Sequence, residues 1–152
     1  MHIVLISPEI PQNTGNIART CALTNTSLHL VKPLGFSIED RYLKRAGLDY
    51  WDKLDIKVWE NFEEIAKKYT KHNFYLATTK AQKKYTDIRY KKNDLLVFGS
   101  ETSGIKKEIL KTLPDNQIRI PMLKIGRSLN LGNSVSIVLY EALRQLDFPG
   151  LE

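Results

Sequence analysis

The chain has 152 residues, of which 42% are hydrophobic and 26% charged, and this length suits one domain with its own core, spanning residues 1–152. No stretch has the eighteen or so apolar residues of a membrane span, and the N-terminal MHIVLISPEI lacks the regions of a signal peptide, so we expect a cytoplasmic protein with no membrane contact. The net charge of +6 favours a polyanionic partner, although a basic, solvated surface explains it equally well.

Short apolar runs alternate with helical patterns along the chain. The runs predict six strands, at residues 3–6, 28–31, 57–59, 74–77, 95–98 and 118–120. The helical patterns predict helices at residues 15–23, 39–46, 62–69, 106–112 and 131–146, the first with Asn13 and Thr14 as candidate caps. This alternation is typical of the α/β class, and we expect a parallel sheet flanked by helices. Ligands of such sheets bind beyond the carboxyl ends of the strands.

The turn after the first strand reads SPEIPQNTGNIAR. Gly15 allows a close approach to the backbone, and amides at a helix N-terminus can hold an anion. Arg19 lies one turn into the predicted helix, where its guanidinium could reach a phosphate or a ribose. The alternative is a capped helix with a surface arginine. The segment is no dinucleotide fingerprint, because G-x-G-x-x-G is absent.

The turn after the fifth strand reads FGSETSG. We expect Gly99 to let a flat ligand lie against the backbone, and Glu101 to accept hydrogen bonds from a ribose or an amine. A tight turn with a capping serine explains the segment equally well. It is not a P-loop, because no Gly-Lys-Ser/Thr ending follows.

The turn after the sixth strand, GRSLNLGNS, joins an apolar strand to a long apolar helix. It holds five polar side chains, namely Arg127, Ser128, Asn130, Asn133 and Ser134. A well-capped helix start is the alternative, but one cap accounts for one or two polar residues. We expect a ligand here, with Asn133 and Ser134 capping the helix.

A long basic group follows the fourth strand. It consists of Lys80, Lys83, Lys84, Arg89, Lys91 and Lys92. Tyr85 and Tyr90 lie among these residues and could stack on bases. The group favours a nucleic-acid partner, with a solvated surface as the alternative.

No residue set for acid–base, nucleophilic or metal catalysis is visible. Cys21 lies in an apolar helical pattern, which is typical of a small core residue. His2, His29 and His72 lie far apart in the sequence with no cysteine or acid at metal-ligand spacing, so we expect no metal. Group transfer from a bound donor onto a polyanion fits this combination, because it can rely mainly on orientation.

These turns, in this order, resemble the SPOUT (SpoU–TrmD) RNA methyltransferases, and most closely the small TrmL/YibK-like group of tRNA wobble-nucleoside 2′-O-methyltransferases. PEIPQNTGNIAR resembles the first family motif, VFGSETSG the second and IPM with RSLNLGNSVSIVLYEALRQL the third, with RAGLDYW and TTK as further markers. The resemblance covers essentially the whole chain. It implies an α/β-knot fold with a C-terminal trefoil knot, S-adenosylmethionine (AdoMet) as cofactor, a homodimer, and tRNA as substrate.

The resemblance also implies roles for particular residues. The cofactor would be bound by Ala77, Thr78, Gly99, Glu101, Ile120, Met122, Ser128 and Leu129. The reaction site would contain Asn13, Arg19, Ser128 and Asn130, with Asn16 nearby in the first motif. Arg19 would orient and stabilise the ribose 2′-hydroxyl as it reacts, in one chain or across the dimer interface, and a role as general base is the weaker version because its pKa stays above about 12. Relatives often carry proline where this chain has Lys106, which adds a basic group near the site.

Two other functions remain open at this point. One is a non-catalytic RNA-binding protein that retains the fold, and the other is a flavodoxin-like nucleotide-binding enzyme. Retention of Arg19, Glu101, Ser128 and Asn130 together favours the methyltransferase.

Overall fold

The computed structural model describes residues 1–38 and 54–152, and these form one seven-stranded sheet with the order β3-β2-β1-β6-β4-β7-β5. Every strand pair in it is parallel. The strands are β1 (His2–Ile6), β2 (Ser27–Val31), β3 (Ile56–Trp59), β4 (Phe74–Ala77), β5 (Lys83–Lys84), β6 (Leu95–Phe98) and β7 (Gln117–Arg119). The predicted α/β class with a parallel sheet is confirmed. The helix predicted at residues 39–46 lies outside the described residues.

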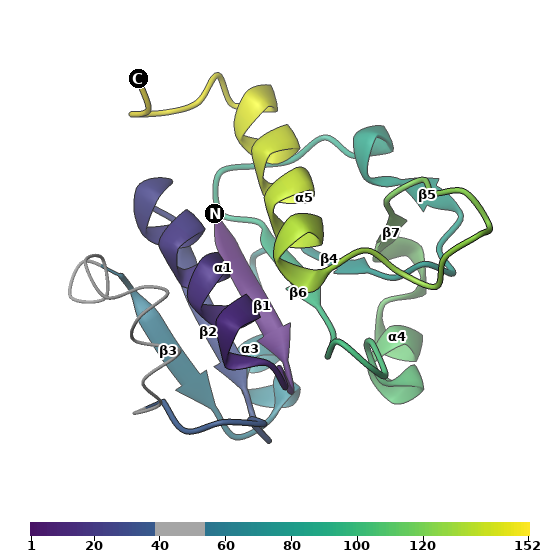
Figure 1. The fold of residues 1–152 in the computed structure, drawn as a ribbon. Helices are drawn as coiled ribbons and strands as arrows, with labels where there is room; N and C mark the ends of the chain where they lie inside the picture. Colours follow the sequence, from purple (N-terminus) through teal and green to yellow (C-terminus); the bar gives the residue numbers. More distant parts are fainter. Residues whose placement is uncertain (39–53) are drawn as a thin grey trace.

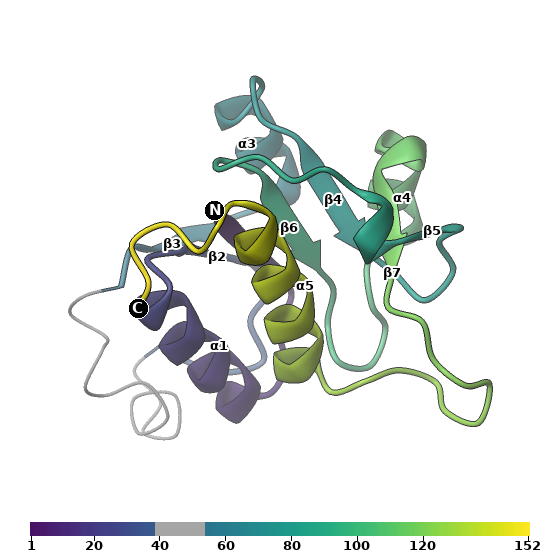
Figure 2. The same cartoon turned by 90° about the horizontal axis from the view of Figure 1, so that it is seen from above.

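Helices cover both faces of the sheet (Figures 1 and 2). On one face lie α1 (Pro11–Leu23) and α5 (Leu131–Gln145), which share a core cluster with β1, β2 and β6. On the other lie α3 (Phe62–Lys68) and α4 (Lys107–Thr112), which pack on a second cluster. Two short 3₁₀ helices, η2 (Tyr85–Asp87) and η3 (Pro114–Asn116), complete the described elements.

The central strands follow directly from their sequences. β6, with the sequence LLVF, is buried at every residue, which is the pattern of a strand covered on both faces. On α1, Cys21 is fully buried, and burial raises the pKa of its thiol. The expectation of a small core residue is confirmed.

One sequence-based expectation about the elements is wrong, and one short strand has no counterpart in the sequence-based prediction. α1 begins at Pro11, four residues before the predicted start, because proline suits the first helical position. Asn13 and Thr14 therefore lie inside the helix and do not cap it; Ile10 occupies the N-cap without a side-chain bond. The strand β5 was also not predicted, because it consists of two exposed lysines with no apolar pattern.

The three histidines, distant in the sequence, come together beneath the end of α3. We call His2, His29, Trp59, Tyr69 and His72 the histidine cluster; their rings pack with centroids 5.1–6.4 Å apart. The Trp59 indole donates to His29 Nδ1 at 3.0 Å, and His29 Nε2 lies 3.1 Å from His2 Nδ1. Because indole only donates, neutral His29 carries its proton on Nε2 and donates to His2.

Burial of these rings disfavours their charged form. It lowers the pKa of His2 to about 4 and that of His29 to about 3. Within residues 1–38 and 54–152 no group of three or more histidine, cysteine or acidic side chains is arranged to hold a metal ion. No helix in these same ranges is long and apolar enough to cross a membrane.

Candidate functional site

A cavity of about 600 Å³ lies at the carboxyl ends of β4, β6 and β7. This is the edge where parallel α/β sheets bind ligands. Of the residues predicted for the site, the following line the cavity: Asn13, Ala77, Thr78, Gly99, Glu101, Ile120, Met122, Ser128, Leu129 and Asn130. Arg19 is the exception. Segments that are up to 117 residues apart in the sequence therefore meet at one hollow.

Glu101 ties the loop after β6 to the start of α1. Its Oε2 accepts from the Glu9 amide at 2.8 Å, and its Oε1 accepts from the Ile10 amide at 3.1 Å. The Asn13 side-chain amide donates to the same Oε1 at 3.0 Å. A carboxylate placed at a helix N-terminus also complements the helix dipole. Three of about four acceptor positions of this carboxylate are thus used within the chain, which leaves one for a ligand.

Asn130 extends this arrangement to the third motif. Its Nδ2 donates to Asn13 Oδ1 at 3.0 Å, while its Oδ1 accepts from the Asn133 amide at 3.2 Å and so caps α5. We call Asn13, Glu101 and Asn130 the asparagine network. It connects the three sequence motifs by side-chain hydrogen bonds. All three residues also line the cavity.

The capping expectation for the third motif needs correction. Asn130 is the N-cap, whereas Asn133 contributes its backbone amide and Ser134 donates its hydroxyl back to the Asn130 carbonyl at 3.1 Å. The position of Asn130 directly before Leu131, the first apolar residue of the helical pattern, is the signal that could have identified it.

Gly99 allows the loop after β6 to fold back on itself. A Cβ at this position would lie 2.0 Å from the Gly104 carbonyl carbon and 2.2 Å from the Ile105 nitrogen. Gly104, with φ of +67°, forms a bridge with Ser100 that closes the loop. The position that a Cβ would take at Gly99 is therefore occupied by the chain's own backbone, while Gly99 itself still lines the cavity.

The loop after β7 and the start of α4 also border the cavity. Residues 121–130 leave the sheet after β7 and return at α5 (Figure 2), and Ile125 in this loop is 92% exposed. Arg127 lines the cavity, as do Lys106 and Lys107 at the start of α4. The expectation that Lys106 adds a basic group near the site is confirmed. These cations face a hollow that also has apolar wall residues such as Phe98 and Leu131.

Arg19 lies outside the cavity of its own chain. It is exposed, as is Asn16 one turn before it, whereas Asn13 is buried. Six residues of helix advance about 9 Å along the axis, which separates Arg19 from the asparagine network. The structure therefore does not bring Arg19 together with the other predicted site residues within this chain.

Residues 1–140 match the SpoU rRNA Methylase family. The putative tRNA (cytidine(34)-2'-O)-methyltransferase of Bacillus subtilis (strain 168) is 48% identical, with 100% of this chain and 97% of the relative covered. The tRNA (cytidine(34)-2'-O)-methyltransferase of Methylovorus glucosotrophus (strain SIP3-4) is 50% identical, with 97% of each covered. A structure that gives insights into the 2-OH methylation of C/U34 on tRNA superposes with a TM-score of 0.91 at 39% identity, covering 96% of this chain and 95% of that one.

Proposed function

Because the chain belongs to the SpoU methylase family, we propose that it is an AdoMet-dependent tRNA 2′-O-ribose methyltransferase that acts on the wobble nucleotide, cytidine or uridine 34. The observation that carries the proposal is the asparagine network, which joins three distant motifs around one cavity. The names of relatives that match along nearly their whole length supply the substrate.

The cavity has the features that AdoMet requires. Its volume of about 600 Å³ lies in the range of cofactor pockets, and its wall combines apolar residues with polar loop residues. When bound, AdoMet supplies an electrophilic methyl group on a sulfonium. We propose that the cofactor is held by residues of β4, β6, β7 and the following loops: Ala77, Thr78, Gly99, Glu101, Ile120, Met122, Ser128 and Leu129.

The reaction needs the ribose 2′-hydroxyl to be oriented and its developing negative charge to be stabilised. We assign this to Arg19, with Asn13, Ser128 and Asn130 shaping the place where the ribose enters. A guanidinium stays protonated at any working pH, so Arg19 holds and stabilises the oxygen and does not remove its proton. The 2′-hydroxyl proton would pass to water as the oxygen–methyl bond forms and the sulfur–methyl bond breaks, with a neutral thioether as the leaving group.

Since Arg19 is outside its own chain's cavity, the proposal includes a homodimer in which Arg19 serves the partner's site. Exposed apolar side chains on α1 and α5 give this dimer a candidate interface, namely Leu23, Ile137 and Tyr140, which are 52%, 37% and 46% exposed. Removing such side chains from water on association is favourable. The proposal also includes a single methyltransferase domain over residues 1–152, a trefoil knot in its C-terminal part and a cytoplasmic location.

The test uses Arg19→Ala with Gln12→Ala, another exposed position of α1, as the control. We expect Arg19→Ala to lose methyl transfer from labelled AdoMet onto unmodified tRNA by about 100-fold or more, the size of effect seen when a charge-stabilising group is removed. Calorimetric AdoMet affinity should be unchanged in both variants.

Near-normal transfer by Arg19→Ala would refute its role, and RNA binding without transfer by the wild type would favour the non-catalytic alternative. Binding of FMN in place of AdoMet would refute the cofactor.

A further inference from the structure

The long basic group found in the sequence is a continuous surface segment that starts at the cavity. We call residues 79–92 the basic strap. It contains six cations and one acid, Asp87, which gives a local net charge of +5, whereas the whole chain carries +6. All six cations are exposed: Lys80, Lys83, Lys84, Arg89, Lys91 and Lys92. Nearly all of the excess positive charge of the chain thus lies in fourteen residues.

The strap is held against the fold by its backbone and its aromatic residues. β5 pairs with β7, and Asp87 accepts from the Lys84 amide at 2.8 Å. Tyr90 is 5% exposed, packs edge-on against Tyr75, and donates from its hydroxyl to the Tyr85 carbonyl at 2.7 Å. The expectation that both tyrosines stack on bases fails for Tyr90, because its ring is buried.

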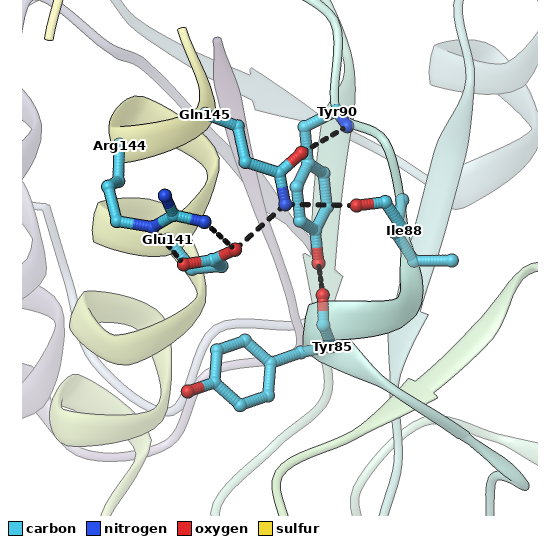
Figure 3. A network of polar contacts seen from close by, with 6 residues as sticks. All are labelled: Tyr85, Ile88, Tyr90, Glu141, Arg144 and Gln145. Carbon is cyan, nitrogen blue, oxygen red and sulfur yellow. Dashed lines mark hydrogen bonds and ion pairs between the residues drawn. The ribbon is translucent and has the colours of Figure 1, made fainter. Parts of the chain in front are cut away.

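Gln145, in the last turn of α5, fastens the far end of the strap (Figure 3). Its Oε1 accepts from the Tyr90 amide at 3.1 Å, and its Nε2 donates to the Ile88 carbonyl at 3.0 Å and to Glu141 at 2.8 Å. Glu141 is in turn paired with Arg144, which lowers the pKa of the Glu141 carboxyl. The backbone of the strap is therefore fixed while its six cationic side chains remain exposed, with Lys83 also donating to the Asp115 carbonyl at 2.7 Å.

The near end of the strap leads into the functional site. Thr79 and Lys80, its first two residues, line the cavity, and the Lys80 amide lies 3.4 Å from the Thr78 hydroxyl. A chain of phosphates that lies on the strap would therefore run directly toward the cavity. Phosphates spaced along a nucleic acid are attracted by fixed rows of Lys and Arg, with release of counterions.

We propose that the basic strap is the surface that binds the phosphate backbone of the RNA substrate and leads it to the cavity, with Gln145 as the positioning residue that keeps the strap in place. This inference rests on the proposed function for the identity of the RNA, namely tRNA. The place where the RNA binds is inferred from the charge and position of the strap. The strap would supply affinity and orientation, while the cavity would supply the chemistry.

The test compares two triple variants that remove the same charge. Lys84→Gln, Arg89→Gln and Lys91→Gln remove three of the six positive charges of the strap. Lys67→Gln, Lys68→Gln and Lys71→Gln neutralise three exposed lysines at the end of α3, on the other face of the sheet. Binding to an unmodified tRNA transcript is measured by fluorescence anisotropy at several salt concentrations, and AdoMet binding by calorimetry.

We expect the strap variant to bind tRNA about tenfold more weakly or worse, with a salt dependence whose log–log slope is smaller by about 2. The α3 variant should bind nearly as the wild type does, and both should keep AdoMet affinity. Gln145→Ala should raise the KM for tRNA and leave kcat at saturating tRNA unchanged. Equal losses in the two triple variants, or equal retention, would overturn the strap as the RNA surface. Wild-type protein that binds tRNA through the strap without methylating nucleotide 34 would refute the proposed function and leave this inference standing.

Discussion

The asparagine network and the histidine cluster are both groups of hydrogen-bonded side chains from different parts of the chain, yet they differ in what their hydrogen bonds join. The asparagine network joins loops at the carboxyl edge of the sheet and borders an open cavity. The histidine cluster joins neighbouring strands beneath α3, and none of its members lines that cavity. The lowered pKa values of His2 and His29 reflect burial first and nearby positive charge second, whereas the candidate chemistry lies beside loops that come together from distant parts of the chain.

The largest effect should come from the loop that closes next to the asparagine network. Gly99→Ala places a Cβ 2.0 Å from backbone, so the loop must open. We expect a loss of about 100-fold or more in AdoMet affinity, in line with the roughly 1–3 kcal/mol or more that overpacking costs. Gly126→Ala is the control, because a Cβ there meets nothing within 4 Å. Calorimetric titration of both variants measures the difference, and unchanged affinity in Gly99→Ala would contradict the loop geometry.

A smaller effect is expected from removing the N-cap side chain of α5, which borders the cavity, compared with that of α3 on the other face of the sheet. Asn130 caps α5 and Asn61 caps α3 through the same kind of bond, at 3.2 and 3.0 Å. Alanine at either position should lower the free energy of unfolding by about 1 kcal/mol. Because only Asn130 also donates to Asn13, Asn130→Ala should in addition weaken AdoMet binding, by about tenfold, which corresponds to one lost hydrogen bond.

Denaturant unfolding and calorimetry measure the two consequences separately. If Asn61→Ala weakened AdoMet binding as much as Asn130→Ala does, the network would have no special relation to the cavity.

The smallest effect at neutral pH should come from the histidine cluster. The pKa values of about 4 for His2 and about 3 for His29 lie below the ordinary 6.5. Below pH 6.5 the unfolded chain therefore binds protons that the folded protein does not. The free energy of unfolding should fall as the pH falls from 6.5 toward 4, by at most about 1.4 kcal/mol per pH unit for each histidine, and by less for the half-exposed His2.

Unfolding of the wild type and of a His2→Gln, His29→Gln variant between pH 7.5 and 4 measures this contribution. The variant should show the shallower decline and, at pH 7.5, normal methyl transfer. Parallel pH curves would mean that the histidines contribute no pH dependence to the free energy of unfolding. A loss of methyl transfer at pH 7.5 would contradict a purely structural role for the histidine cluster.

Much of this arrangement could be predicted from the sequence, and the failures have physical reasons. Strands such as β6 are continuous apolar runs, so their positions follow from burial. The resemblance of the motifs assigned the predicted site residues to one binding site. All of them except Arg19 line one cavity. By contrast, Glu101 forms hydrogen bonds with partners that lie 88 to 92 positions earlier in the sequence. The sequence pattern within one turn carries no information about such distant partners.

Other features depend on packing that local patterns do not contain. Gly99 is needed because Gly104 and Ile105 return to it, which only the folded loop reveals. The histidines meet because β1, β2 and the end of α3 are neighbours. The two exposed lysines of β5 pair with β7 without any alternation of apolar and polar residues.

The most direct test of 2′-O-methylation at the wobble nucleotide is methyl transfer by the purified wild-type protein from labelled AdoMet onto two synthetic tRNAs that differ by one oxygen atom. One carries ribose at nucleotide 34, and the other carries 2′-deoxyribose there. We expect incorporation of a methyl group into the first, mapped by mass spectrometry to the 2′-oxygen of nucleotide 34, and none into the second. Equal incorporation into both tRNAs, or none into the first while AdoMet and tRNA both bind, would contradict the proposed function.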